Sequence, residues 1–168
     1  QAARQGGQNL VRLGHVLGLL RLNGYADLAP SQEFMARTLG AVTVPEAPHA
    51  ECDIRTDTSS DAPRPGFAVR VTRDAAEIAT CEVIPANAFV SSPGARDTCL
   101  VDSVGVVDGH RGAGWGRYVL ARALQESGGF GFTTAVVGTT SDNARAQLLY
   151  TNAGFRATHR MYSLTKHV

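Results

Sequence analysis

The sequence predicts an α/β fold built on a mixed sheet, and three observations support this. β-rich runs, several of them alternating, follow one another from Gly66 onward. Two helical patterns, at 115–126 and 143–152, separate the last of these runs. A strand that passes through a helix into the next strand normally forms a parallel pair. The order strand, strand, strand, helix, strand, helix, strand therefore indicates a sheet of mixed direction.

The first third of the chain predicts two helices. Apolar residues at steps of three and four predict an amphipathic helix that ends at Asn23–Gly24, and they are Leu10, Leu13, Val16, Leu17 and Leu20. Residues 31–39 predict a shorter helix that Gly40 ends and that packs on the first through Phe34, Met35 and Leu39. An apolar stripe like that of the first helix is mostly part of a core, and the polar face of this helix is too weakly basic for binding to a membrane surface. If the stripe were unburied, it would favour a homodimer.

Residues 42–66 hold four prolines and predict a loop with a short strand at 51–55. This loop is either a mobile cover on the substrate side or a plain surface loop. We therefore expect an N-terminal segment of helices and loop at 1–65 and a core at 66–168. The chain begins with Gln1 instead of Met, which leaves open a missing upstream part of the first segment.

Five runs predict the strands of the core. Residues 67–72 and 78–84 alternate around a turn at Arg73–Asp74 and predict a hairpin. Residues 98–107, 132–138 and 155–164 predict further strands, the first two of them buried. Gly128–Gly129 and Gly154 are expected to end the two intervening helices, and Ser141 or Asp142 is expected to cap the second.

Composition narrows the class of protein. The chain has 168 residues, 43% of them hydrophobic, which is enough for one substantial core. A net charge of +1 gives no indication of nucleic-acid binding. Three widely spaced cysteines without a C-x-x-C pair predict neither a zinc site nor disulfides, and reduced cysteines fit a cytoplasmic protein. No apolar stretch of about 18 residues or more predicts a membrane span.

The stretch Arg111–Gly116 joins the predicted strand at 98–107 to the predicted helix at 115–126. A glycine-rich loop at the start of a helix exposes backbone N–H groups, which together with the helix dipole favour a phosphate-bearing ligand. A nucleotide P-loop needs Gly-Lys-Ser/Thr, but the single lysine is Lys166. A dinucleotide fingerprint needs a third glycine where Arg117 stands. Neither motif fits this loop.

The loop does fit the pattern Arg-x-x-Gly-x-Gly, and the second helix carries Asn143-x-x-Ala146-x-x-Leu149-Tyr150-x-x-Ala153-Gly154-Phe155. These motifs, one strand apart, resemble the signature of the Gcn5-related N-acetyltransferase (GNAT) family over about residues 66–164. The resemblance implies a sheet with central splayed parallel strands and helices on both faces. The family usually opens with a strand and two helices, whereas no clear strand precedes the two helices predicted here. That difference concerns the substrate side.

The resemblance implies transfer of an acetyl group from acetyl-CoA to a primary amine, without a covalent enzyme intermediate. The loop would hold the pyrophosphate, and the strand around Val104–Val106 would separate from the next strand and pair with the pantetheine arm. The implied cofactor-binding residues are Val104, Gly105, Val106, Arg111, Gly112, Ala113, Gly114, Trp115, Gly116, Asn143 and Tyr150. Trp115 is expected to pack the helix start onto the sheet, with adenine stacking as the lesser alternative.

Tyr150 would protonate the departing thiolate, and it shares a helix face with Asn143, seven residues earlier. A half-buried tyrosine and a capping asparagine are the alternatives. The attacking amine must lose a proton, for which Asp102 in the central strand is the leading base and Glu82 the second. The alternative for Asp102 is an ion pair with an arginine. His110 is expected to be a surface residue beside the phosphates.

Two other functional classes remain open. A non-catalytic acyl-CoA-binding module would bind the cofactor without turnover. An unrelated nucleotide-binding domain would bind ATP or NAD. The acceptor stays open among antibiotic amines, polyamines, amino acids and protein amines, and so does the length of the acyl chain.

Overall fold

The computed structural model describes residues 18–166, with side chains at all of them except 26–31 and 163–166. The chain divides into two compact units, Gln1–Gln32 with Arg160–Val168, and Glu33–His159. In the first unit, residues 18–22 are helical and Asn23–Gly24 form the predicted turn. The other residues of the predicted stripe, Leu10, Leu13, Val16 and Leu17, lie outside the described residues. Every predicted site residue belongs to the second unit.

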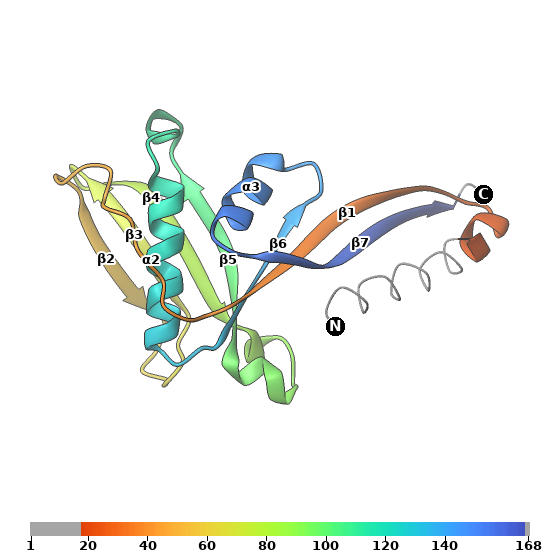
Figure 1. Ribbon diagram of the computed structural model, residues 1–168, viewed down its shortest axis with the longest axis horizontal. Helices are drawn as coiled ribbons and strands as arrows, with labels where there is room; N and C mark the ends of the chain where they lie inside the picture. The colour runs from red at the N-terminus through yellow and green to blue at the C-terminus, as the bar shows by residue number, and fades with distance from the viewer. Residues whose placement is uncertain (1–17, 167–168) are drawn as a thin grey trace. The chain divides into compact units, whose positions relative to one another are not determined.

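A seven-stranded sheet of order β2-β3-β4-β5-β6-β1-β7 organises the fold (Figure 1). The strands are β1 (Tyr25–Thr38), β2 (Asp53–Thr58), β3 (Phe67–Arg73), β4 (Ala76–Pro85), β5 (Thr98–Val106), β6 (Thr134–Thr140) and β7 (Arg156–Lys166). The helices α2 (Trp115–Gly129) and α3 (Ala144–Asn152) follow β5 and β6. Strands β2 to β5 pair antiparallel, whereas β5 and β6 pair parallel. The predicted α/β class and mixed sheet are confirmed.

Helix α2 packs on β3, β4 and β5, and this contact forms the core. Alternate residues of the three strands point toward it and are at most 1% exposed, namely Val69, Val71, Cys81, Val83, Cys99 and Val101. The residues of the helix that pack against them are also at most 1% exposed, namely Trp115, Val119, Leu120, Ala123 and Leu124. Burial of each large apolar side chain contributes about 1.5–3 kcal/mol. The start of α2 is thereby held against the strands that precede it.

The helix predicted at 31–39 is wrong, because these residues belong to strand β1 and its exit. Phe34 lies over Gly138 of β6, with its ring 3.2 Å from the place of a Cβ on that glycine. Met35 is 4% exposed and belongs to the core, and the Leu39 N–H donates to the Thr133 oxygen at 2.7 Å. A short apolar run fits either period, so contact with β6 decided the structure.

The predicted loop is present between β1 and β2, and its short strand, β2, starts two residues later than predicted. The loop is not loosely attached. Val42, Val44, Ala47 and Cys52 are partly buried against the core. Pro48 reaches the start of α2, where its Cγ lies 3.7 Å from the place of a Cβ on Gly114. In Figure 1 this segment, in orange to yellow, passes along α2.

The three cysteines are free. Burial raises the pKa of the Cys81 thiol and of the Cys99 thiol, and the Cys99 Sγ also lies 3.5 Å from the Ser127 Oγ. We therefore expect a thiol reagent at pH 8 to modify Cys52 alone in the native protein and all three thiols after unfolding. Mass spectrometry of the labelled protein would check this, with Cys52→Ser as the unlabelled control. Rapid labelling of two native thiols would contradict the packing of this core.

None of the helices in the described part of the chain is long and apolar enough to cross a membrane.

Candidate acetyl-CoA site

Two glycines shape the loop between β5 and α2. Gly112 has φ +80° and Gly114 has φ +96°, a conformation that other residues adopt only with strain. Gly114 is the N-cap of α2, and a glycine cap offers no side-chain acceptor to the N–H groups behind it. Gly116 lies in the first turn, where an added Cβ would be 3.7 Å from Val106 and 3.8 Å from Leu149. The start of α2 thus meets the end of β5 and the side of α3.

The loop leaves a row of backbone donors without acceptors. Within residues 18–166, no acceptor is seen for the N–H groups of residues 112–117, whereas the next one, of Tyr118, donates to the Gly114 oxygen at 3.0 Å. The first turn of α2 carries no acidic residue that could neutralise the helix dipole. Such a set of donors at a helix start is suited to an anion.

The side chain of Arg111 is engaged within the loop. Its Nε donates to the Val106 oxygen at 3.1 Å, and one terminal nitrogen lies 2.6 Å from the Asp108 carboxylate. The guanidinium therefore ties the loop to the end of β5. The backbone N–H of Arg111 also donates to the Asp108 oxygen at 3.3 Å, so the unpaired donors of the loop begin at Gly112.

Strands β5 and β6 separate beside this loop. Their parallel pairing runs from Thr98–Thr134 to Val101–Val137 and then stops, although β5 continues to Val106 and β6 to Thr140. The predicted separation is therefore present. The edge of β5 at Val104, Gly105 and Val106 lacks strand pairing on this side, which leaves backbone groups for an extended ligand.

A β-bulge gathers three polar residues on one face of β4 and β5. Glu82 pairs with Ser103 and Val83 with Val101, so Asp102 is the extra residue. Val83 and Val101 are each 1% exposed and face α2, so the residues next to them face the other way. The Ser103 hydroxyl lies 3.3 Å from the Glu82 carboxylate, to which it donates. Both predicted base candidates therefore lie together on the face opposite α2.

Asp102 is exposed and not buried, which removes the burial argument for its function. Its place in the bulge, beside the separated strands, is the stronger reason to consider it. Ser103 was not predicted, because its spacing of two residues from Val101 would place it on the α2 face of a regular strand, and only the bulge turns it toward Glu82.

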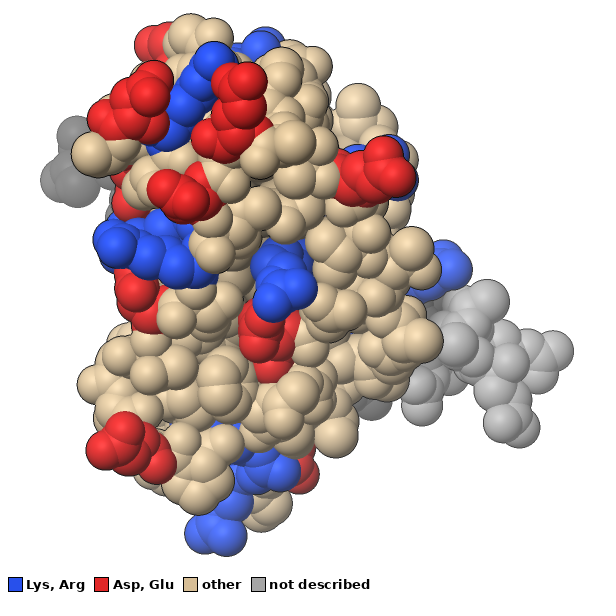
Figure 2. All heavy atoms as spheres, turned by 90° about the vertical axis from the view of Figure 1, so that its left-hand side faces the viewer, with Lys and Arg blue, Asp and Glu red and all other residues tan. Residues whose placement is uncertain are grey.

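Glu82 belongs to a network of charges centred on Arg70. The Arg70 guanidinium lies 3.6 Å from Glu82, 2.6 Å from Glu77 and 3.3 Å from Asp57. The hydrogen bond to Glu77 is the largest cause of a raised pKa for Arg70. These side chains are part-exposed, so the pairs contribute little to stability. Figure 2, viewed from the β2 side, shows acidic and basic side chains interspersed, with no field of a single sign.

Asn143 caps the start of helix α3, whereas Tyr150 is buried near its end. Asn143 is the N-cap, and its side-chain oxygen accepts from the Ala146 N–H at 3.1 Å. Tyr150 is 7% exposed, and its ring centroid lies 5.9 Å from that of Phe155. Burial, followed by the nearby Cys81, raises the pKa of Tyr150 above its ordinary value. The phenol is therefore protonated at neutral pH and able to donate.

For Trp115 and His110, the structure agrees with the predicted positions of the side chains. Trp115 is 1% exposed, with its ring edge-on to Tyr118 at 5.8 Å between centroids, so it packs the helix start as expected. That burial leaves no ring face for adenine stacking. His110 is partly exposed in the short 3-10 turn before Arg111.

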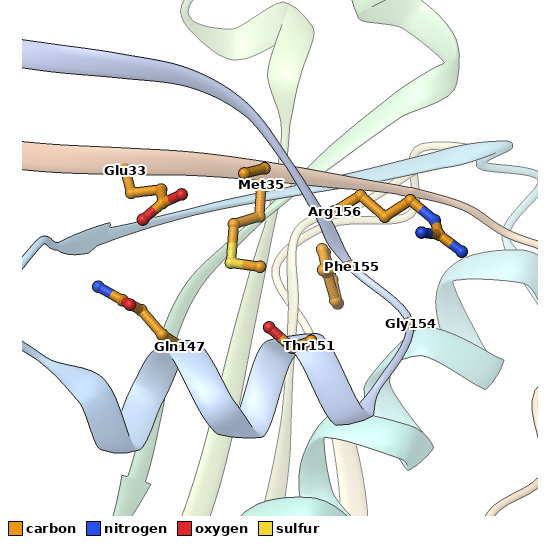
Figure 3. A pocket seen from close by; sticks show the side chains of 8 residues that line it. Glu33, Met35, Gln147, Thr151, Gly154, Phe155 and Arg156 are labelled. Carbon is orange, nitrogen blue, oxygen red and sulfur yellow. The ribbon is translucent and has the colours of Figure 1, made fainter. Parts of the chain in front are cut away.

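Two open cavities lie elsewhere in the second unit, beside α3. One of about 460 Å³ has Glu33 and Met35 of β1 on one side and Gln147 and Thr151 of α3 on the other (Figure 3). The other, of about 600 Å³, lies at the C-terminal end of α3 near Arg37. The sequence could not indicate either cavity, because β1 was predicted as a helix. Neither is lined by the glycine loop or by residues 102–106.

The family model of the GNAT acetyltransferases matches residues 21–155, across both motifs and the separated strands. The chain belongs to this family. The family and the fold support acyl transfer in general.

Solved structures agree with the fold of this GNAT chain. A GCN5-related N-acetyltransferase from Sphaerobacter thermophilus is 20% identical with a TM-score of 0.64, and the match covers 89% of this chain and 54% of that one. One from Kribbella flavida is 20% identical with a TM-score of 0.60, covering 88% and 62%. A tandem GNAT protein from the clavulanic acid biosynthesis pathway is 14% identical with a TM-score of 0.59, covering 84% and 54%.

The chain thus spans about half the length of two of these proteins. At these identities the likeness shows the fold alone. No curated protein matches the chain.

Proposed function

We propose that this chain is an N-acetyltransferase that moves an acetyl group from acetyl-CoA to a primary amine by direct attack. The observation that carries the proposal is the row of unpaired N–H groups at residues 112–117, placed beside the separated ends of β5 and β6. A diphosphate suits the first feature, and an extended arm with two amides suits the second.

The residues present fit coenzyme A as a ligand. The place of a Cβ on Gly112 is open, with no atom within 4 Å. The N–H groups of residues 112–117 would hold the diphosphate, with Gly114 and Gly116 allowing close approach. Val104 to Val106 would pair with the pantetheine arm, and one N–H there would donate to the thioester oxygen as charge develops on it. The bound cofactor supplies the activated acyl group as a thioester.

Tyr150 would act as the general acid. Its raised pKa keeps the proton on the phenol until the thiolate leaves. A thiol of ordinary pKa near 8.5 gives a thiolate that needs the proton only as the carbon–sulfur bond breaks. Asn143 would contribute by fixing the start of α3, since its side chain is bonded to the Ala146 N–H.

The amine would approach from the open face opposite α2. A lysine-like amine has a pKa of roughly 10.4 and must be neutral to attack. Asp102 is the base we favour, because it is exposed in the bulge, whereas Glu82 is engaged by Ser103 and Arg70.

We expect Asp102→Asn to lower kcat/KM for the amine about 100-fold, the usual scale for a general base. Glu82→Gln should lower it less than about fivefold, because that carboxylate would only support its neighbour. Rates of thiol release at one pH over a range of amine concentrations would check this, with both variants and the wild type measured side by side. The reverse ranking would assign the role to Glu82, and two unaffected variants would assign it to water.

The first experiment is calorimetric titration with acetyl-CoA, using NAD and ATP as controls. Micromolar binding of acetyl-CoA alone supports the cofactor, and a screen of amines for thiol release then tests catalysis. Binding without release of thiol from any amine would instead indicate an acyl-CoA-binding module. Binding of ATP or NAD would contradict the proposal.

A further inference from the structure

The loop between β1 and β2 brings two residues from far upstream to the start of α2. Its backbone is anchored by the Leu39 bond to Thr133 and by the packing of Val42, Val44 and Ala47. Beyond these anchors, Pro48 lies beside Gly114, with its Cγ 3.7 Å from the place of a Cβ on that glycine. The His49 ring lies against Trp115, with 6.2 Å between centroids and 51° between planes. The loop is therefore a fixed wall beside the glycine loop.

Two large side chains of the glycine loop, those of Arg111 and Trp115, are not free to donate a hydrogen bond to a ligand. Arg111 is engaged by Asp108 and Val106, and Trp115 is buried. His49 is exposed at the same helix start with its ring against that of Trp115, and no hydrogen bond or ion pair of this ring is seen within the described part of the chain. Both ring nitrogens of His49 are thus available near the unpaired N–H groups.

A second observation at this place also concerns hydrogen bonding. The Trp115 indole N–H is buried and has no acceptor among the described residues. A neutral imidazole has one accepting and one donating nitrogen. If His49 accepted from the indole through one nitrogen, its proton would be held on the other, turned toward a ligand at the helix start.

We propose that His49 is a further cofactor-binding residue, which donates a hydrogen bond to the diphosphate of coenzyme A. This rests on the proposed function and deepens it. The phosphate site would then be formed by two segments far apart in the sequence, the loop at 112–117 and the wall at Pro48–His49.

Calorimetry with coenzyme A and with dephospho-coenzyme A, which keeps the diphosphate and lacks the 3′-phosphate, tests the proposal. We expect His49→Leu to weaken both ligands equally, by about tenfold, the scale of one hydrogen bond to a charged group. His49→Gln keeps a donor and should lose less. His159→Leu, an exposed histidine in β7, is the matched control and should bind as the wild type does.

Each outcome decides something different. Unchanged binding by His49→Leu overturns the inference and leaves the proposed function standing. A loss confined to coenzyme A overturns the diphosphate contact and points to the 3′-phosphate. A wild-type protein that binds neither ligand overturns the proposed function and this inference together. Because His49 is exposed, the variants should unfold at the wild-type temperature, which a melting curve checks.

Discussion

Tyr150→Phe is expected to lower turnover by at least about 100-fold while acetyl-CoA affinity stays within about twofold. The phenylalanine fills the same buried space against Phe155, so the change removes the proton donor and little else. The rate of thiol release at saturating amine and calorimetric titration of acetyl-CoA would measure the two effects separately.

The pH dependence provides the control for this variant. Because burial raises the pKa of Tyr150, the phenol should remain protonated up to and beyond its ordinary pKa near 10. The wild type should therefore show no fall in rate from loss of this proton between about pH 6 and 9. If the Tyr150→Phe variant lost affinity for acetyl-CoA but kept its turnover, Tyr150 would be a binding residue and not the general acid.

Ala113→Glu is expected to weaken acetyl-CoA binding by about 30–100-fold. Ala113 is exposed in the glycine loop, between two glycines of positive φ, and its own φ is not in that region. A carboxylate there would lie beside the diphosphate. Repulsion of roughly 2–3 kcal/mol follows for two phosphate charges at about 5 Å in a largely aqueous surrounding. Calorimetry would measure the loss.

The same substitution should raise the melting temperature of the unliganded protein slightly. A carboxylate near the unpaired N–H groups stabilises a helix start by about 0.3–1 kcal/mol. Ala113→Gln, of equal shape and no charge, should show neither effect beyond a few tenths of a kcal/mol. Equal binding by the Glu and Gln variants would mean that no anion sits at this loop.

The parts predicted correctly are those that depend on neighbours in the sequence. The alternation in β3 and β4 and the glycines of the loop act over a few residues. So do the apolar positions along α2. The same holds for α3, except that its cap is Asn143 and not Ser141 or Asp142. The glycine loop and the two helices beside it could therefore be predicted in outline.

The prediction for residues 31–39 failed for the opposite reason. Phe34, Met35 and Leu39 satisfy a helical spacing, but Phe34 covers Gly138 and Leu39 bonds to Thr133. Both partners lie about a hundred positions away in the sequence. A run this short carries too little local preference to resist such contacts.

The sequence by itself determined a glycine loop at a helix start, a tyrosine two helical turns after an asparagine, and the strands on either side of these two helices. Only the tertiary structure decided that a one-residue bulge turns Asp102 and Ser103 toward Glu82. It also decided that β5 leaves β6 after Val101 and that His49 lies beside Trp115. Helix starts and turns depend on local backbone geometry, whereas strand register and loop packing depend on partners far along the chain.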